Sequence, residues 1–331
     1  MIRVAVLGAG RIGQIHAANV AANPLAQLMV VVDPVSASAE ALAKNLGCES
    51  SVDAEKTIAR TDIDAVVIGT PSDTHARLML LAARAGKAVL CEKPVDNDID
   101  KADAAVAELK QLNAKVMMAF NRRFDPSNIE LRRAIDAGDI GEVRQVIITS
   151  RDPGLPPRDY VAHSGGIFRD MAIHDFDMAR FLLNEEPTEV YAKASRVVNK
   201  ALMEEFDDYD TLMVIMQTAS GKQCHINCCR EAVYGYDQRF EILGSTGMLM
   251  NDNLRPSTVR RYNASETEAL QPLLNFFLQR YTDAYRNELD AFLKALKDNA
   301  PMPTNPWDGR QALRLAEAAL ESVKTGCTVK V

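Results

Sequence analysis

The sequence predicts an α/β domain with a parallel sheet, followed by an α+β domain with a large, open and mostly antiparallel sheet. Over the first 120 residues, short apolar runs alternate with helical patterns, as in parallel strands joined by crossover helices. After residue 120, several strand-like runs follow one another without helices between them, which favours antiparallel pairing. The 331 residues suffice for two domains, which we expect at residues 1–120 and 121–331.

The expected strands of the first domain are almost entirely apolar, as strands covered on both faces should be. They lie at residues 4–7, 28–32, 65–69, 88–91 and 116–119. The helices expected between them include 12–22, 74–85 and 99–113.

The second domain is expected to begin with a helix and a long strand, at 127–137 and 143–150. A helix at 170–183 follows a Gly-Gly step. The consecutive strands are then expected at 189–197, 211–217, 223–229, 238–243 and 248–250. Turn pairs such as Ser220-Gly221 and Gly244-Ser245 separate some of them. Two helices, at 274–297 and 310–324, close the chain.

Composition excludes several classes of function. Hydrophobic residues make up 47% and charged residues 25%, which is ordinary for a globular protein. A net charge of −7 provides no basic surface for nucleic acid or an anionic membrane. We expect no signal peptide, because a strand begins almost at once, and no apolar run approaches the roughly 18 residues of a membrane span. Six cysteines without a regular spacing favour a reducing, cytoplasmic location.

One cysteine cluster could suggest a metal site. In the strand-like run at 223–229, alternation places Cys224 and Cys228 on one face and His225 and Cys229 on the other. No second ligand pair with zinc-site spacing occurs elsewhere. We therefore expect half-buried strand cysteines and no metal.

A glycine pattern follows the first strand. Gly8, Gly10 and Gly13 form GxGxxG at the start of the first helix. Such glycines permit a tight turn and a close backbone approach, and the helix N-terminus then faces a pyrophosphate. We expect the intervening Arg11 and Ile12 to lie beside the cofactor as well. The pattern predicts a Rossmann dinucleotide-binding domain.

Asp33 ends the second apolar run, 20 residues after Gly13. A carboxylate at this place hydrogen-bonds the ribose 2′-hydroxyl of NAD and repels the 2′-phosphate of NADP. No arginine follows in Pro34-Val35 to accept that phosphate, so we expect NAD. The alternative is a loop glycine cluster beside a turn aspartate.

The next two strands end in polar segments at the edge where parallel sheets bind ligands. Thr70 and Pro71 follow the strand at 65–69, and we expect both at the cofactor. His75 either faces the cofactor or caps the first turn of its helix. The segment Cys91-Glu92-Lys93-Pro94 ends the following strand, where Glu92 and Lys93 would lie near the nicotinamide. A lysine after a strand is otherwise usually a solvated surface charge.

The segment at 165–183 carries acid–base residues. Read as one helix, it places Asp170, His174 and Asp177 on a polar stripe at i, i+4 and i+7. Oxidation of an alcohol by hydride transfer needs a base for the hydroxyl proton, and histidine has a suitable ordinary pKa. An aspartate one turn away can orient the imidazole and bind a substrate hydroxyl. The alternative is an ordinary surface ion pair.

Together, GAGRIG, Asp33, CEKP and the D-x-x-x-H of Asp170 and His174 resemble the glucose–fructose oxidoreductase/inositol dehydrogenase family. The resemblance covers essentially the whole chain. Four segments look like the family's inositol 2-dehydrogenase branch: NRRFDP, SRDPGLPPRDY, SGGIFRDMAIHDFDMARFLL and EAVYGYDQRFEILGSTG. The resemblance implies a Rossmann domain with an α+β domain whose open sheet builds dimers and tetramers; we expect a homotetramer.

The resemblance further implies that Lys93, Asp170 and His174 form the catalytic group, with His174 as the base. We expect Lys93 to meet the other two residues at the cleft between the domains. The resemblance also implies substrate contacts from residues in three other segments. These residues are Arg122, Asp152, Tyr234 and Tyr236.

The residues alone leave these contacts open. Period 2 would put Tyr234 and Tyr236 on one face, either at the polyol or as a packed pair. Asp152 lies where a strand gives way to a proline-rich turn, a reasonable place for a binding carboxylate. Arg122 is equally an ion-pair partner.

The expected function is oxidation of myo-inositol to an inosose with hydride transfer to NAD+. Within the same chemistry, scyllo-inositol, another cyclic polyol or an aldose is an alternative substrate. An oxidoreductase that keeps its cofactor permanently bound is another possibility. A cofactor-binding sensor without catalysis would lack the catalytic lysine or histidine, whereas Lys93 and His174 are both present. No nucleic-acid or membrane partner is expected.

Overall fold

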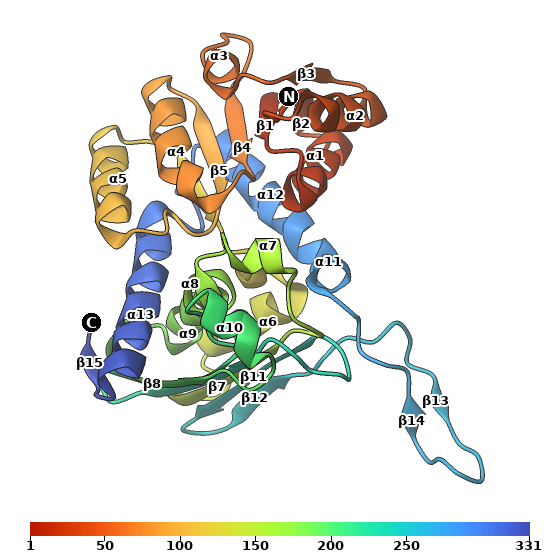
Figure 1. Ribbon diagram of the computed structural model, residues 1–331, viewed down its shortest axis with the longest axis vertical. Helices are drawn as coiled ribbons and strands as arrows, with labels where there is room; N and C mark the ends of the chain where they lie inside the picture. The colour runs from red at the N-terminus through yellow and green to blue at the C-terminus, as the bar shows by residue number, and fades with distance from the viewer. The chain divides into compact units, whose positions relative to one another are not determined.

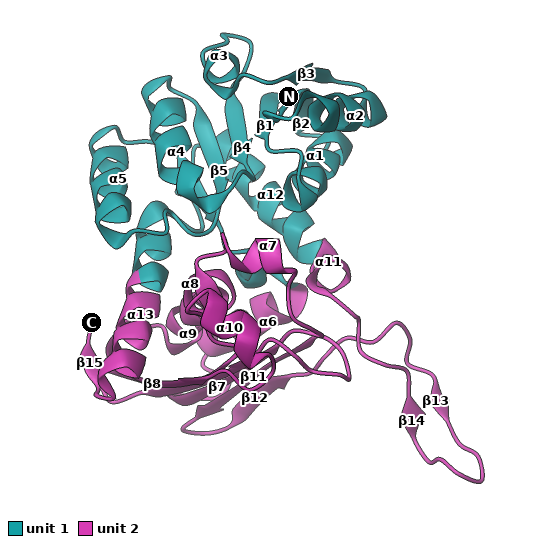
Figure 2. Ribbon diagram, in the orientation of Figure 1, with its two compact units in different colours: residues 1–125, 283–313 teal, residues 126–282, 314–331 magenta.

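The computed structural model describes all residues, 1–331, and Figure 1 shows its helices and strands. The chain divides into two compact units, coloured separately in Figure 2. Unit 1 comprises Met1–Asp125 and Asp283–Leu313, and unit 2 comprises Pro126–Thr282 and Arg314–Val331. The sequence places the boundary at residue 120 and assigns everything after it to the second domain. In the structure, a late segment returns to unit 1.

Unit 1 is built on a six-stranded sheet with the order β3-β2-β1-β4-β5-β6, and every pairing in it is parallel. This order is that of a doubly wound dinucleotide-binding sheet. The strands are β1 (Ile2–Leu7), β2 (Ala26–Val32), β3 (Glu49–Ser51), β4 (Ala65–Ile68), β5 (Ala88–Glu92) and β6 (Val116–Ala119). The predicted α/β class is confirmed.

Crossover helices join these strands, and two short 3-10 turns follow β4 and β6. The helices are α1 (Arg11–Ala22), α2 (Ser36–Leu46), α3 (Ala54–Ile58), α4 (His75–Arg84) and α5 (Ile99–Gln111), and the turns are η1 (Ser72–Thr74) and η2 (Asn121–Phe124). Strand β3 was not predicted, because it has three polar residues and no apolar run.

The return of Asp283–Leu313 to unit 1 has a packing cause. Helix α12 (Thr282–Asp298) carries Leu289, Phe292 and Leu293 at helical spacing, each at most 1% exposed. These side chains share one hydrophobic cluster with Val4 and Val6 of β1. Burial of this stripe on the parallel sheet ties the segment to unit 1.

Unit 2 contains a seven-stranded sheet with the order β12-β11-β7-β10-β9-β8-β15. Only the β7–β10 pair is parallel, which confirms the predicted, mostly antiparallel sheet. Its strands are β7 (Val143–Arg151), β8 (Pro187–Ser195), β9 (Thr211–Thr218), β10 (Gln223–Cys229), β11 (Asp237–Gly244), β12 (Met248–Asn251) and β15 (Val329–Lys330).

The helices of unit 2 are mostly short, and a separate hairpin extends away from the main sheet in Figure 1. The helices are α6 (Pro126–Asp136), α7 (Arg158–Val161), α8 (Gly166–Asp170), α9 (Ile173–Leu183), α10 (Lys200–Glu205) and α11 (Phe277–Arg280), and the hairpin is β13 (Arg260–Arg261) with β14 (Ala269–Leu270). Helix α13 (Pro306–Thr325) runs through both units. No helix combines the length and the apolar composition that crossing a membrane requires.

Two predicted helices are interrupted. The helix expected at 170–183 is divided, because α8 ends at Asp170 and α9 begins at Ile173. The helix expected at 274–297 is divided into α11 and α12. The apolar period continues across each break, so periodicity alone cannot reveal it.

The strand interpretation of the cysteine cluster is confirmed. Cys224 and Cys228 are 1% and 2% exposed, whereas His225 and Cys229 on the opposite face of β10 are half-buried. Helix α9 packs on β7 and β10. Cys228 donates its thiol to the Asp175 carboxylate of α9 at 3.3 Å, so the buried face is the one beneath this helix.

Candidate functional site

The glycine loop between β1 and α1 is held in a shape that side chains would prevent. Gly8 has a φ of +102°, and a Cβ there would lie 2.5 Å from the carbonyl oxygen of Gly69. A Cβ on Gly13 would overlap the carbonyl oxygen of Gly8. Gly10 is the N-cap of α1, and a Cβ on it would meet nothing within 4 Å. The loop therefore packs tightly against β4 but leaves open space at Gly10, as a pyrophosphate cradle requires.

Asp33, directly after β2, is fixed beside this loop. One carboxylate oxygen accepts a hydrogen bond from the backbone N–H of Ala9 at 2.8 Å, and the other accepts from Val35 N–H at 2.9 Å. Asp33 is half-buried. A carboxylate held next to the glycine loop fits the ribose of a dinucleotide. Arg11 and Ile12 form the start of α1 as expected, and their contacts with a cofactor remain predictions.

His75, the first residue of α4, connects the two loops that follow β4 and β5. Its Nδ1 lies 2.7 Å from the carbonyl oxygen of Pro94, and its Nε2 lies 2.9 Å from that of Thr70. The ring is 1% exposed. The side chain therefore does not cap its own helix but ties together two predicted cofactor loops. A direct contact between His75 and the cofactor remains a prediction, as does one from the exposed Pro71.

The end of β5 carries the predicted Glu92 and Lys93. Glu92 is the last strand residue and is 8% exposed. Its carboxylate lies 2.9 Å from Nε2 of His16, a buried residue of α1. Lys93 follows at the carboxyl edge of the parallel sheet and is half-buried. Arg122, in η2 after β6, is 3% exposed and lies in the same unit.

In unit 2, Asp170 is the centre of a polar cluster that contains the buried Arg230 and the 49% exposed Tyr160. The hydroxyl of Tyr160 donates to one carboxylate oxygen at 2.7 Å, and the guanidinium of Arg230 donates to the other at 3.4 Å. Arg230 is 1% exposed and also pairs with Asp208 at 3.5 Å. Desolvation by the surrounding groups, together with the charge of Asp170, raises the pKa of Tyr160 above its ordinary value. The phenol therefore stays protonated and holds Asp170 as a donor.

His174 comes directly after the break between α8 and α9. It is the second residue of α9 and is half-buried. The predicted polar stripe does not extend to Asp177, which is 1% exposed and lies 3.6 Å from Arg180 of its own helix. Because α8 ends at Asp170, the three residues do not share one continuous helix face. The description of Asp170, His174 and Asp177 as one helical stripe is therefore wrong.

The remaining predicted substrate residues have different surroundings. Asp152 lies just beyond β7, and its charge acts on both Tyr160 and Arg230. Tyr234 donates its hydroxyl to Asp237 at 2.7 Å and is half-exposed. It lies in the turn before β11, so the predicted strand face shared with Tyr236 does not exist.

Tyr236 is 5% exposed and packs edge-on against Tyr281 and Phe276. Tyr234, in contrast, lines a cavity of about 580 Å³ that Asp152, Asp170 and His174 do not line. The structure thus brings Asp152 close to the Asp170 cluster and leaves Tyr234 in a separate place. Substrate contacts from all four residues, Arg122 included, stay predictions.

Two members of the cluster, Tyr160 and Arg230, were not predicted from the sequence. Arg230 directly follows β10, just as Lys93 follows β5. A charged residue at the end of a predicted strand could therefore have indicated Arg230 as a candidate site residue. Tyr160 lies in the four-residue helix α7 after the proline-rich turn. No local pattern indicates that this phenol reaches Asp170, ten residues further along the chain.

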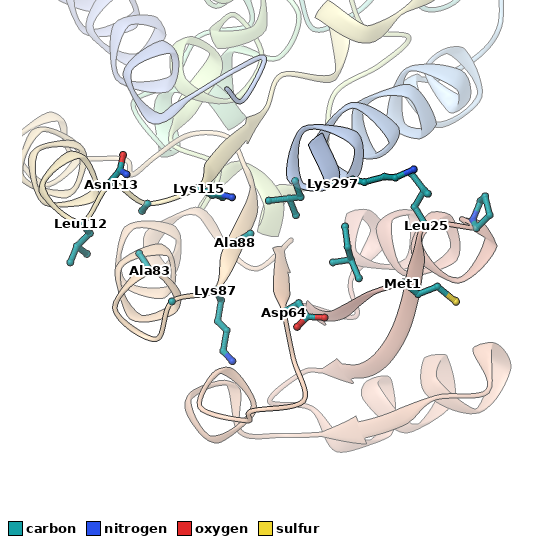
Figure 3. A pocket seen from close by; sticks show the side chains of 15 residues that line it. Met1, Leu25, Asp64, Ala83, Lys87, Ala88, Leu112, Asn113, Lys115 and Lys297 are labelled. Atoms are coloured by element: carbon teal, nitrogen blue, oxygen red, sulfur yellow. The ribbon is translucent and has the colours of Figure 1, made fainter. Parts of the chain in front are cut away.

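Unit 1 also contains a cavity of about 640 Å³, which Figure 3 shows from close by. Its lining includes Met1, Asp64, Lys87 and Lys115, which precede strands β1, β4, β5 and β6. It is therefore at the amino ends of the strands, whereas the glycine loop, Thr70 and Lys93 are at the carboxyl ends. Ligands of such sheets bind at the carboxyl ends, so this cavity is not the candidate site.

The geometry supports two chemical capabilities. Unit 1 offers a pyrophosphate cradle, a ribose-binding carboxylate and an amine at the same sheet edge. Unit 2 offers an imidazole that can take a proton and a carboxylate held by two donors. This is the set of groups that hydride transfer from an alcohol to a dinucleotide needs.

Comparisons with known proteins agree with this assignment. Residues 2–120 match an oxidoreductase family with an NAD-binding Rossmann fold. Residues 129–250 match the GFO/IDH/MocA C-terminal domain. The expected family and NAD as its cofactor are thereby confirmed.

Similarity extends over whole chains. An inositol 2-dehydrogenase of Rhizobium meliloti is 50% identical over 97% of this chain and 97% of its own. The crystal structure of a myo-inositol dehydrogenase from Corynebacterium glutamicum matches with a TM-score of 0.96 and 46% identity, covering 100% of this chain and 99% of its own. A scyllo-inositol dehydrogenase from Lactobacillus casei, solved with NAD(H) and scyllo-inositol, matches with a TM-score of 0.93 and 30% identity, covering 100% and 99%.

Proposed function

Because the chain belongs to the GFO/IDH/MocA family of NAD-binding oxidoreductases, we propose that it oxidises myo-inositol at one ring hydroxyl to an inosose. The observation that carries this proposal is the 50% identity to an inositol 2-dehydrogenase over 97% of the chain. The Asp170 cluster gives the proposal a chemical basis, because its charges and donors suit a polyhydroxylated substrate.

In the proposed reaction His174 takes the proton of the reacting hydroxyl. Asp170, held by Tyr160 and Arg230, binds a neighbouring hydroxyl and orients the imidazole. The amine of Lys93 stabilises the negative charge that develops on the reacting oxygen. Bound NAD+ supplies the hydride acceptor. The residues of the glycine loop and Asp33 bind and orient this cofactor.

We propose a preference for NAD+ over NADP+. The carboxylate of Asp33 is fixed by the backbone N–H groups of Ala9 and Val35, so it cannot easily turn away from a 2′-phosphate. Steady-state kinetics with both cofactors test this preference. We expect a much higher kcat/KM with NAD+, and comparable values would contradict the assignment of Asp33.

The substrate is tested by NADH formation from NAD+ with inositol stereoisomers and common aldoses. We expect the highest kcat/KM with myo-inositol. scyllo-Inositol is the second candidate, because the chain is 30% identical to a scyllo-inositol dehydrogenase across its full length. A clear preference for scyllo-inositol would replace the first proposal by the second. No turnover of any polyol or sugar would contradict both.

We also propose a homotetramer. The outer face of the unit 2 sheet exposes a group of apolar side chains, each between 43% and 62% exposed: Met213, Ile215, Leu243, Met248 and Met250. Such an apolar face is typical of a surface that a second copy covers. Light scattering at micromolar concentration should give the mass of a tetramer, whereas a monomer would contradict the proposal.

The cytoplasm is the proposed location. The six cysteines form no disulfide, which suits a reducing compartment. Recovery of the native protein in a cell fraction outside the cytoplasm would contradict this location.

A further inference from the structure

A buried group of ionisable side chains lies at the end of β5, outside the proposed chemistry. It comprises His16 of α1, Glu92 of β5 and Glu288 of α12, which are 0%, 8% and 0% exposed. Nε2 of His16 lies 2.9 Å from a carboxylate oxygen of Glu92. The charge of Glu92 also acts on Glu288. Three elements of unit 1 therefore converge on the residue that precedes Lys93.

Glu288 differs from the other acids of the chain in its surroundings. Neither of its carboxyl oxygens has a hydrogen-bond partner among the side chains and backbone around it. Burial, with a further contribution from the charge of Glu92, raises the pKa of Glu288 well above its ordinary value. An ionised carboxylate in such a place would be strongly unfavourable. The protonated form of Glu288, which carries an O–H donor, is therefore the favoured one in the folded protein.

Two acceptors are available to a proton on Glu288: the carboxylate of Glu92, whose charge acts on it, and Nδ1 of His16, which also has no hydrogen-bond partner. One turn earlier on α12, Tyr285 presents its ring edge-on to the His16 imidazole, with the centroids 5.7 Å apart. His16 already contacts Glu92 through Nε2. A neutral carboxylic acid beside a carboxylate can donate to it, and this removes the repulsion that two charges would cause.

We propose that Glu288 is a positioning residue, whose carboxylic acid acts with His16 to hold the Glu92 carboxylate and so fix the strand end that presents Lys93. This inference rests on the proposed role of Lys93. Lys93 is joined to Glu92 by one peptide bond, so a shift of Glu92 moves the amine as well. A displacement of about 1 Å in a catalytic group can lower a rate by about 10²-fold.

The pKa direction also predicts how folding stability depends on pH. The unfolded chain loses the Glu288 proton near the ordinary carboxyl pKa, whereas the folded chain keeps it to a higher pH. The contribution of Glu288 to the free energy of unfolding is therefore fully present below the ordinary carboxyl pKa. It is lost as the pH rises toward the pKa of Glu288 in the folded protein. The amide of Glu288→Gln cannot ionise, so the stability of this variant does not fall with pH for this reason.

The test compares Glu288→Gln, which keeps an N–H donor, with Glu288→Leu, which keeps the volume and lacks a donor. Asp283→Asn, on the exposed side of α12, is the matched control. We expect Glu288→Gln to retain most of the wild-type kcat and Glu288→Leu to lose about tenfold, as for one lost hydrogen bond. On the alkaline side, the wild-type kcat should begin to fall at a lower pH than the kcat of Glu288→Gln.

Thermal melting of the same proteins gives a readout that does not depend on activity. The Tm of Glu288→Gln should rise relative to wild type as pH increases from about 5 to 9. Equal kcat and pH profiles for the Gln and Leu variants would overturn the positioning role. A pH-independent Tm difference would overturn the protonated state. If wild type fails to oxidise any polyol while the Tm difference appears, the proposed function fails and the protonated Glu288 stands.

Discussion

The two units hold their candidate functional groups by different means. In unit 1 the glycine loop is shaped by backbone contacts, because a Cβ on Gly8 or Gly13 would meet the backbone of Gly69 or Gly8. In unit 2 Asp170 is held by side chains, through the hydroxyl of Tyr160 and the guanidinium of Arg230. The first site should therefore be sensitive to added volume. The second should be sensitive to a change in charge or to a lost donor.

The largest effect is expected from Lys93→Ala. It removes the positive charge that stabilises the developing oxyanion, so kcat should fall at least as far as when a general base is lost, about 10²–10⁴-fold. Stopped-flow or steady-state formation of NADH with the proposed substrate measures the loss. Lys93→Arg, which keeps the charge, is the matched control and should retain more activity. Equal rates for the wild type and Lys93→Ala would remove the lysine from the mechanism.

His174→Ala is expected to lower kcat by about 10²–10⁴-fold while the affinity for NAD+ stays the same. The reason for this separation is that His174 lies in unit 2, whereas the glycine loop and Asp33 belong to unit 1. Fluorescence titration with NADH gives the affinity, and turnover gives kcat. If the variant kept more than about a third of the wild-type kcat, His174 would not be the base.

Arg230→Met tests the charge-based construction of unit 2. It would leave Asp170 and the buried Asp208 without their cation, and breaking a buried pair such as Arg230–Asp208 costs about 3–5 kcal/mol of folding free energy. Denaturant unfolding measures the loss. The control is Arg133→Met, whose exposed pair with Glu130 should contribute little. A loss at Arg230 no larger than at Arg133 would show that Asp170 does not depend on this cation.

The smallest effects are expected from alanine substitutions in the glycine loop, where Gly13→Ala should affect stability and Gly10→Ala should affect cofactor binding. Gly13→Ala places a methyl group against the Gly8 carbonyl and should lower the free energy of unfolding by about 1–3 kcal/mol through overpacking. Gly10→Ala meets nothing within 4 Å and should leave the Tm unchanged while weakening NAD+ binding. Thermal melts with and without NADH distinguish the two. Unchanged NADH affinity in Gly10→Ala would contradict the placement of the pyrophosphate.

The same contrast explains what the sequence could predict. The strands at the glycine loop, Asp33 and Lys93 were predictable, because their signals are local: an apolar run, a turn glycine and a charge at the strand end. The return of α12 to unit 1 was not predictable. The apolar stripe with Leu289 and Phe292 indicates that one face of the helix is buried, but it does not indicate which sheet covers that face.

The Asp170 cluster shows the same limit. The spacing of Asp170 and His174 was visible in the sequence, but the break at residues 171–172 was not, since apolar residues continue through it. Arg230, 60 residues after Asp170, contacts it from just beyond the end of β10, and only the folded sheet brings the two together. Ion pairs between distant segments leave no periodic signal, which is why the cofactor loop was predicted in more detail than the substrate cluster.

The proposed reaction removes hydride from a ring carbon of myo-inositol and delivers it to NAD+. The most direct measurement uses myo-inositol with deuterium on every ring carbon and determines the mass of the NADH produced by the purified wild type. We expect NADH that carries deuterium, together with an inosose that has lost it from the oxidised carbon. Formation of unlabelled NADH, or no NADH from myo-inositol at any substrate concentration, would contradict it.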